Sequence, residues 1–590
     1  MCFSSKYPIC SVSSVASPVP EVPLSDAIAY DYIIAGGGTA GCALASRLSE
    51  DSRRTVLLIE RGEVVNTWKS KVPLLSIDYR PSGYPAYKWK SAPVAALQNE
   101  AFNMVSGKLL GGTSKINAHF YTRTTPSDHA AWTEAGTKGW AWDDVLPFYV
   151  KSEASVSHGD RAYRGSKGPW VNRKMPRVYF ENTNHVLKVC PLVGLPQIEA
   201  NNPSESPFGI LETDMTIDSD GRRHSTFDAF LPHGVAAARA ARLKICTGAV
   251  VQTLHFDQAE GKPRVDGVFL EQEDAEFGKR FFARARREVI VCSGAIGSPQ
   301  VLLLSGIGPA NHLQHKNIPI VKDLSGVGNH LQDHYGVSVI FRCRKNDTLH
   351  HVQDNPLVAL GQFLRYLIRG DGLLLAPFPQ MSIFAVSRLL DEESQTVAQD
   401  ASDRDPFSAR NRPDIEIMPI PYNASDWKFE LGEDGCFSFL VVNLTPKSKG
   451  TVRLASTDPR IRPDCDLGSL QDPDDFVVMR KGIKLALRLA SEMRKLGYRL
   501  DDQVVPKSLS DEDLDAFIVH GARTTYHYSS TCRIAPEAEG GVVDEKLRVH
   551  GVDGLRVADA SVFPTIPSTH LQAPAVMVAE RCAAFLQEGQ

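Results

Sequence analysis

The sequence predicts a mixed α/β protein, and three observations lead to this prediction. The chain has 590 residues, which exceeds the roughly 250–300 residues at which a single core stops growing, so at least two domains are expected. Apolar residues make up 43% and charged residues 23% of the chain, as in ordinary globular proteins. The segment "YDYIIAGGGTAGCALASRLSEDSRRTVLLIE" follows the order strand, glycine-rich turn, helix, strand. That order is typical of a Rossmann-like unit.

Three glycines in this segment have the spacing of a dinucleotide-binding turn. An apolar run at 32–35 fits a strand that is buried on both faces. Gly36, Gly38 and Gly41 follow it as GxGxxG. Gly36 allows the tight turn, Gly38 lets the backbone approach a pyrophosphate, and Gly41 lets the helix pack against the strand.

The helix and the second strand complete the unit. The helix begins near Thr39 and Ala40, and its first N–H groups can hold phosphate oxygens. The second strand, "TVLLIE", ends at Glu60, nineteen residues after Gly41, where a carboxylate can accept hydrogen bonds from a ribose. These residues predict dinucleotide binding and leave FAD, NAD and NADP open, although Glu60 disfavours a 2′-phosphate by charge repulsion.

Charge and cysteine content exclude several other classes of function. A formal net charge of -4 provides no footprint for nucleic acid or an anionic membrane. The eleven cysteines are odd in number, scattered, and never form a CxxC pair, which argues against a disulfide framework and a zinc site. We therefore expect a small-molecule partner and no metal.

The N-terminus has the composition of a leader that lacks structure. Residues 1–27 are rich in Ser and Pro and contain no continuous apolar core of a signal peptide, so they are expected to be disordered. No apolar run reaches the roughly 18 residues that a membrane span needs. These features predict an intracellular, cytoplasmic protein without a membrane span.

Two further glycine-rich segments follow the first unit. In "SGKLLGGTSKINAHFYTR", Gly112 and Thr113 belong to a turn whose backbone amides can hold an anion or a ring edge. In "CSGAIGSPQVLLLSGIGP", a strand end and a turn precede a helix that Ser298 and Pro299 are expected to open. Taken singly, each segment is also explained by structure alone.

Together, the ordered motifs resemble the glucose-methanol-choline (GMC) family of FAD-dependent oxidoreductases. "GKLLGGTSKIN" and "GAIGSPQVLLLSGIG" are similar to that family's two signatures. "DLSGVGNHLQDH" resembles the segment after the second signature, and the C-terminal "GGVVDEKLRVHGVDGLRVADASVFPTIPSTHLQAPAVMVAERCA" resembles the closing motif. The resemblance runs from about residue 30 to the end and is weakest between about 340 and 510. Aryl-alcohol oxidases and choline dehydrogenase-like members are the implied relatives.

The resemblance implies a Rossmann-like FAD-binding domain in discontinuous pieces and an inserted substrate domain with an antiparallel sheet and helices. We place the FAD-binding domain at 28–158, 206–331 and 521–590. The substrate-binding domain is then 159–205 and 332–520.

It also implies specific contacts to FAD. Asn117 and Ala118 match positions beside the isoalloxazine ring, and the backbone of Val251 matches a position at the adenine. Asp559 and Ala560 match positions near the pyrophosphate and the ribityl chain. Some relatives carry a flavin-linked histidine before the asparagine, but Ile116 stands there. The expected FAD is therefore non-covalent.

Two histidines match the catalytic positions of the family, although each has a plainer explanation. His527 in "YHYSSTCRIAP" fits a core histidine, and His570 in "PSTHLQAP" fits a loop residue. By resemblance, His527 is the base that takes the alcohol proton while flavin N5 accepts the hydride, and His570 orients the substrate oxygen. A neutral imidazole at pH 7 suits this role. Residues 528–530 depart from the family pattern and predict a different substrate-side wall.

The sequence predicts the substrate and the reaction only as broad classes. The apolar stretch Val358 to Val386 fits a core; where it lines the site, it favours an aromatic or aliphatic primary alcohol. Tyr526 is expected to act as an aromatic gate on the substrate side. The expected reaction is alcohol oxidation to an aldehyde, with O2 or another electron acceptor. The alternatives are a GMC-fold lyase, cyclase or light-driven decarboxylase, and a binding protein with a vestigial site. Oligomeric state stays open.

Overall fold

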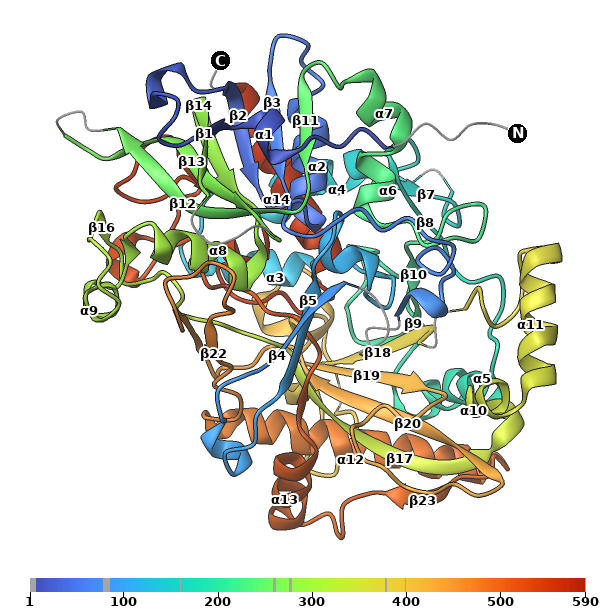
Figure 1. The fold of residues 1–590 in the computed structure, drawn as a ribbon. Helices are drawn as coiled ribbons and strands as arrows, with labels where there is room; N and C mark the ends of the chain where they lie inside the picture. The colour runs from blue at the N-terminus through green and yellow to red at the C-terminus, as the bar shows by residue number, and fades with distance from the viewer. Residues whose placement is uncertain are drawn as a thin grey trace.

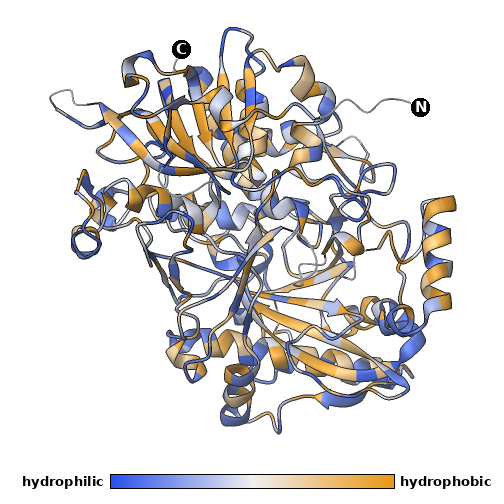
Figure 2. Cartoon of the chain, viewed as in Figure 1, coloured by the Kyte–Doolittle hydropathy of each residue, from blue (hydrophilic) through white to orange (hydrophobic). Residues whose placement is uncertain are grey.

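The computed structural model describes residues 7–77, 85–159, 161–257, 261–274, 279–376, 379–397 and 399–588. Figure 1 shows two parts, one above the other, and each is built on a large β-sheet. Helices and sheets contribute to both parts, which confirms the mixed α/β prediction. In Figure 2 the strands of both sheets are mostly hydrophobic, as expected for sheets buried on both faces.

The first sheet has the order β11-β3-β2-β14-β13-β12, and β1 and β25 also pair with β14. Its strands are β1 (Ser17–Pro18), β2 (Ala29–Ala35), β3 (Val56–Ile59), β11 (Leu243–Cys246), β12 (Ala249–Asp257), β13 (Arg264–Gln272), β14 (Phe281–Val291) and β25 (Leu555–Val557). Strands β11, β3, β2, β14 and β25 pair in parallel. β12, β13 and the start of β14 form an antiparallel meander.

Two helices from opposite ends of the chain cover the parallel strands. Helix α2 (Thr39–Leu48) packs on β2 and β3, and α14 (Gln572–Glu588) lies beside α2. A buried ion pair joins them, with Arg47 Nη2 at 2.7 Å from Glu580 Oε1. The C-terminal segment therefore completes the first domain.

The second sheet is antiparallel and has the order β23-β17-β20-β19-β18-β9, with β24 paired to β17. Its strands are β9 (Gly209–Glu212), β17 (Tyr335–Arg344), β18 (Met381–Ala385), β19 (Ile415–Ile420), β20 (Asp434–Asn443), β23 (Asp501–Val504) and β24 (Arg523–Thr524). Helix α12 (Pro473–Lys495) packs on one face. On β19, Ile415 and Ile417 join the core on the α12 side, whereas Met418 and Ile420 belong to a cluster on the other face. This alternation follows the period of two in a strand.

Shorter elements connect the two sheets. The remaining helices are α1 (Val12–Val15), α3 (Pro126–Glu134), α4 (Trp142–Ser152), α5 (Glu181–Val189), α6 (Thr226–Phe230), α7 (His233–Ala238), α8 (Gly294–Leu304), α9 (Ala310–His315), α10 (His350–Asp354), α11 (Pro356–Arg369) and α13 (Asp511–Gly521). The remaining strands are β4 (Ala86–Lys90), β5 (Asn103–Gly107), β6 (Phe120–Tyr121), β7 (Glu153–Ser155), β8 (Trp170–Asn172), β10 (Asp214–Met215), β15 (Ile307–Gly308), β16 (Lys322–Asp323), β21 (Thr451–Arg453) and β22 (Asp464–Asp466).

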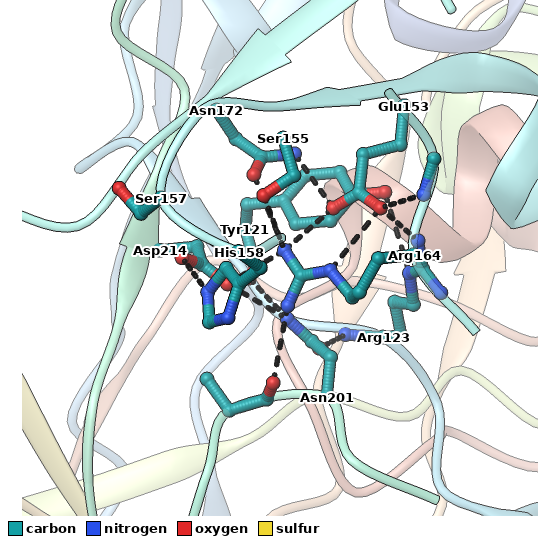
Figure 3. A network of polar contacts seen from close by, with 12 residues as sticks. Tyr121, Arg123, Glu153, Ser155, Ser157, His158, Arg164, Asn172, Asn201 and Asp214 are labelled. Atoms are coloured by element: carbon teal, nitrogen blue, oxygen red, sulfur yellow. Dashed lines mark hydrogen bonds and ion pairs between the residues drawn. The ribbon is translucent and has the colours of Figure 1, made fainter. Parts of the chain in front are cut away.

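A buried polar network ties β7 and β10 to neighbouring loops, as Figure 3 shows. Arg164 Nη2 lies 2.6 Å from Glu153 Oε1 and 2.9 Å from Asp214 Oδ2. Arg123 contacts the second oxygen of Glu153, and His158 contacts Asp214. Asn172 also donates to Glu153 and Asn201 to Asp214, so each carboxylate has three donor side chains and neither is left as an uncompensated buried charge.

The N-terminus differs from the expectation of a disordered leader. Residues 1–6 lie outside the described residues, but from Tyr7 onward the chain packs on the first sheet. Ser17 and Pro18 pair with the start of β14, and Val15 and Ala16 are fully buried. The composition of this segment predicts disorder because its apolar residues are too few to form a core of their own. The segment is ordered because the first sheet offers these residues an apolar surface.

Three local expectations also differ in detail. Strands β9 and β24 pair within the second sheet, although we had placed both in the FAD-binding pieces. Helix α8 begins at Gly294, not at Pro299. Pro299 lacks the N–H that would bond to the Ala295 carbonyl, and the Thr531 hydroxyl donates to that carbonyl at 2.6 Å instead.

Candidate active site

A cavity of about 1100 Å³ lies between the two sheets. Its lining brings together nearly all of the residues singled out in the sequence. These are Gly36, Gly38, Thr39, Ala40, Glu60, Gly112, Thr113, Asn117, Ala118, Val251, Tyr526, His527, Asp559, Ala560 and His570. Gly41 alone lies behind the lining, as its predicted packing role requires. The site therefore draws on segments spread over more than 500 residues of sequence.

The first glycine turn has the geometry that its sequence predicts. Gly36 has φ +113°, and a Cβ there would lie 2.4 Å from the Cys292 carbonyl oxygen. A Cβ on Gly41 would lie 1.9 Å from the Gly36 carbonyl oxygen, so only glycine lets α2 sit this close to β2. A Cβ on Gly38 would meet only the Gly112 Cα, at 3.9 Å. That open side is where the backbone can approach a ligand.

A second glycine turn faces the first. Gly112 has φ +52°, and a Cβ on it would come within 2.8 Å of the Gly38 Cα. The Thr113 hydroxyl accepts a hydrogen bond from the Gly107 N–H at 3.2 Å and so fixes the turn. Both turns thus present side-chain-free backbone to the cavity, which suits an anion such as a pyrophosphate.

Two buried carboxylates support these turns. Glu60 accepts hydrogen bonds from the backbone N–H groups of Gly37 and Gly62 at 2.9 and 2.8 Å. Burial raises the pKa of Glu60 to about 7. Asp559 accepts from the Gly294 N–H at 2.8 Å and from the Ser298 hydroxyl at 2.5 Å, and so anchors the start of α8.

Arg223 holds the loop that carries Asn117. Its guanidinium is only 2% exposed and donates to the Asn117 side-chain oxygen at 2.8 Å and to the Ser114 carbonyl at 3.0 Å. The Asn117 amide donates in turn to Gln572 Oε1 at 2.9 Å. The sequence analysis missed Arg223, because the neighbouring Arg222 is exposed and nothing in "GRRHS" distinguishes the two.

The three histidines 334, 527 and 570 lie side by side. The ring centroids of His527 and His570 are 5.1 Å apart and those of His527 and His334 are 5.0 Å apart, with near-perpendicular planes in both pairs. Tyr526, at φ +66°, begins the turn that carries His527. The Asp333 carboxylate accepts a hydrogen bond from the backbone N–H of His527 at 2.7 Å and fixes that turn. His334 was not assigned a role from the sequence, although it ends the quoted "LQDH" segment.

Hydrogen bonds at His527 Nδ1 define its tautomer. The Thr525 hydroxyl donates to the His334 carbonyl at 2.8 Å, so its oxygen can only accept from His527 Nδ1, which lies 3.3 Å away. His334 Nδ1 lies 2.9 Å from the same nitrogen. Only one of these two facing ring nitrogens can carry the proton, and we assign it to Nδ1 of His527, with the Thr525 oxygen and Nδ1 of His334 as its acceptors. Nε2 is then the basic nitrogen of the ring.

His570 has a more rigid setting. It stacks on Phe120 with ring centroids 4.4 Å apart and an interplanar angle of 2°. The Thr122 hydroxyl lies 3.3 Å from its Nδ1, and Glu416 Oε1 lies 3.8 Å from its Nε2. The stack on Phe120 and the contact with Thr122 fix the ring plane, which suits a residue that orients another group.

Removal of the Thr525 hydroxyl should slow the reaction without removing the cofactor. Thr525→Val keeps the shape but removes one of the two acceptors at His527 Nδ1, so the unreactive tautomer becomes more populated. A hydrogen bond of about 1 kcal/mol corresponds to a loss of roughly five- to tenfold in the rate of flavin reduction. Single-turnover kinetics would measure it, with Thr133→Val on the exposed side of α3 as the control. Loss of flavin with no change in rate per bound flavin would contradict a positioning role.

Burial keeps both cavity histidines neutral. It lowers the pKa of His527 well below the ordinary histidine value, and the neighbouring His570 lowers it further. Burial also lowers the pKa of His570 to about 3. Because its pKa is lowered, His527 stays neutral at pH values below the ordinary histidine pKa. The rate of flavin reduction should therefore stay constant as pH falls through about 6.5. The rate should fall only at lower pH, through the lowered pKa of His527. A half-maximal rate at or above about pH 6.5 would contradict this setting.

Part of the cavity wall is apolar. Met418, Ile420 and Leu440 come from the second sheet and Phe363 from α11, and all four line the cavity. Part of the apolar stretch Val358 to Val386, which the sequence predicted as either core or site lining, therefore lines the site. Tyr526 lines the same region beside His527.

The residues present fit FAD, the cofactor that GMC oxidoreductases use. Two bare glycine turns suit a pyrophosphate, Glu60 stands where a ribose is expected, and the cavity exceeds the common range of about 300–1,000 Å³ for small-ligand sites. Within the described residues, no cluster of His, Cys, Asp and Glu side chains is arranged to hold a metal ion. No helix within the described ranges is long and apolar enough to cross a membrane.

Comparisons with known proteins agree with this site. The N-terminal family model of GMC oxidoreductases matches residues 30–336, and the C-terminal one matches residues 446–579. The chain is 34% identical to a dehydrogenase, str4, of Strobilurus tenacellus, over 95% of this chain and 94% of that protein. It is 31% identical to a chloroplastic fatty acid photodecarboxylase of Chlamydomonas reinhardtii, over 95% and 90%. It is 32% identical to an oxygen-dependent choline dehydrogenase of Chromohalobacter salexigens, over 95% of each protein.

Solved structures share the fold over the same extent. A formate oxidase variant of Aspergillus oryzae, studied for FAD modification, superimposes with a TM-score of 0.83 at 26% identity, over 95% of this chain and 98% of that chain. The family matches and these similarities cover both sheets and the cavity between them. The chain therefore belongs to the GMC oxidoreductase family.

Proposed function

We propose that this protein oxidises an apolar primary alcohol to the aldehyde with non-covalent FAD, and that His527 is the general base. The observation that carries the proposal is that His527 and His570 lie together in the cavity lining, with ring centroids 5.1 Å apart and the Thr525 hydroxyl 3.3 Å from Nδ1 of His527. When bound, FAD accepts the hydride from the alcohol carbon. O2 or another acceptor would then reoxidise it.

His527 would take the hydroxyl proton on Nε2. This proton transfer is needed because an unactivated alcohol holds its proton too tightly at neutral pH. The resulting imidazolium keeps Nδ1–H bonded to Thr525 and His334. His570 would orient the hydroxyl oxygen, since Phe120 and Thr122 hold its ring in place.

The lining supports the choice of an apolar substrate. Met418, Ile420 and Leu440 of the second sheet and Phe363 of α11 contribute apolar side chains to the cavity lining. A sugar would leave its hydroxyl groups without partners on such a wall, at a cost of about 1–3 kcal/mol each. Tyr526 would close over the apolar group.

Product analysis tests the substrate class. The FAD-loaded protein would be incubated with benzyl alcohol, 1-octanol, choline and glucose, and the aldehydes quantified. We expect turnover of benzyl alcohol or 1-octanol and none of glucose. Preference for choline or glucose over both apolar alcohols would overturn the substrate class while leaving alcohol oxidation intact.

A second candidate is light-driven decarboxylation of a fatty acid. It is favoured by the similarity to the photodecarboxylase and by the same apolar wall. It predicts an alkane from a fatty acid under blue light, with no need for His527. Alkane formation without alcohol turnover would replace the first proposal with this one.

We also propose the domain division given above, with β9 and β24 reassigned to the substrate-binding domain. The proposal of dissociable FAD is supported by Ile116, which precedes Asn117 where some relatives carry a flavin-linked histidine. Denaturation with acid should release the flavin into the supernatant, whereas a covalent link would keep it on the protein.

A further inference from the structure

Helix α11 exposes a row of large apolar side chains to water. Leu357 and Ile368 are 81% and 78% exposed, and Leu360, Leu364 and Leu367 are 52%, 45% and 53% exposed. Their spacing places these five residues, which we term the docking face, on one side of a helix. Figure 2 shows this helix as a mostly hydrophobic element at the edge of the molecule. Exposed apolar faces of this kind mark interaction surfaces.

The opposite side of α11 belongs to the wall of the cavity. Ala359 and Phe363 line the cavity, and the Tyr366 hydroxyl donates to the Gly221 carbonyl at 2.9 Å. Asn355 caps the start of the helix by accepting from the N–H groups of Leu357 and Val358. The helix is thus well formed, and the docking face lies on the side of α11 opposite the residues that line the cavity.

The surroundings of the docking face are cationic and include an exposed tryptophan. Helix α11 contains Arg365 and Arg369 and no acidic residue. Arg177 and Arg365 share the single carboxylate of Asp371, which leaves an excess of positive charge. Trp68 is 48% exposed and packs edge-on against Phe363, with ring centroids 5.5 Å apart. Basic residues beside an apolar helix face, with a nearby Trp, are typical of helices that lie in a membrane interface.

We propose that the docking face binds flat on the surface of an anionic lipid bilayer and brings the cavity wall formed by Ala359 and Phe363 to the membrane. The helix has 14 residues, fewer than the roughly 20 that span a bilayer, so it lies in the interface. The net charge of -4 on the whole chain predicts no attraction to an anionic membrane, but α11 carries two arginines that locally match anionic headgroups, and its leucines match acyl chains. A second copy of the chain would instead place the same cationic cluster against itself.

Co-sedimentation of the FAD-loaded full chain with vesicles tests this directly, without substrate and independently of the reaction. We expect binding to vesicles of mixed phosphatidylcholine and phosphatidylserine, and weaker binding to phosphatidylcholine alone. The triple variant Leu357→Gln, Leu364→Gln and Ile368→Gln should lose at least about tenfold in vesicle binding, because each buried aliphatic side chain contributes substantially. Arg369→Gln should weaken binding only to the anionic vesicles.

A matched control carries the same changes at Leu192, Leu496 and Leu509, which are 60%, 46% and 48% exposed elsewhere on the surface. This control should bind vesicles like the unmodified protein. If the triple variant does not retain FAD, the pair Leu360→Gln and Leu367→Gln replaces it. The proposal is overturned by an absence of vesicle binding or by an equal loss in the control. It is also overturned by a dimer in light scattering that the triple variant abolishes, which would assign the face to a second copy.

Discussion

Replacing His527 with alanine should slow anaerobic flavin reduction by about 10²–10⁴-fold, the usual contribution of a general base. The ring that is lost carries its proton on Nδ1, held by Thr525 and His334. His570, the other histidine of the described cavity lining, has its Nδ1 beside the Thr122 hydroxyl and its ring stacked on Phe120, so we expect it to replace His527 poorly. Stopped-flow absorbance would measure the rate constant at saturating alcohol.

Two further variants test whether the loss of rate is specific to the base. His527→Gln keeps a polar side chain but no basic nitrogen, so it should lose as much activity as the alanine variant. His315→Ala, on the exposed end of α9, should leave the rate unchanged. A rate within about tenfold of the unmodified protein for His527→Ala would be far below the expected loss and would remove His527 from the mechanism.

Gly41→Ala should remove FAD from the protein and lower its stability. The new Cβ would lie 1.9 Å from the Gly36 carbonyl oxygen, and that oxygen belongs to the turn that approaches the pyrophosphate. Relief requires α2 to move away from β2, which opens the first sheet and displaces the turn. Overpacking against backbone costs about 1–3 kcal/mol or more, so we expect at least tenfold weaker FAD binding and a lower melting temperature.

The ratio of flavin to protein after purification and a thermal melt would measure both effects. Gly234→Ala is the matched control, since Gly234 lies in α7 with no atom within 4 Å of the added Cβ. Alanine there should be neutral or stabilising by up to about 1 kcal/mol. Full flavin content and an unchanged melting temperature in Gly41→Ala would contradict the packing described for α2.

The first unit of the fold could be predicted from the sequence because its signals are local. The glycine spacing, the apolar strand and Glu60 all lie within 32 residues, and the structure places them as expected. The helix boundary of α8 was missed because Thr531, more than 230 residues away, satisfies the carbonyl that Pro299 leaves free. The ordered N-terminus was missed for the same reason, since only the folded sheet offers Val15 and Ala16 a place to be buried.

In the candidate site, too, features with local sequence signals could be predicted and long-range contacts could not. Family motifs located His527 and His570, but their spacing of 43 residues does not by itself bring them together. His334 is separated from His527 by 193 residues and reaches it through the pairing of β17 with β24. Its contact with Nδ1 depends on strand register and not on any local pattern. Arg223 reaches Asn117 across 106 residues in the same way.

The visible spectrum of the FAD-loaded protein under anaerobic conditions, before and after addition of an apolar primary alcohol, tests the proposed reaction most directly. Bleaching of the flavin band, slowed by about 10²–10⁴-fold in His527→Ala, is the predicted result. A flavin that stays oxidised while the alcohol, or a fatty acid under blue light, is converted would contradict alcohol oxidation through His527.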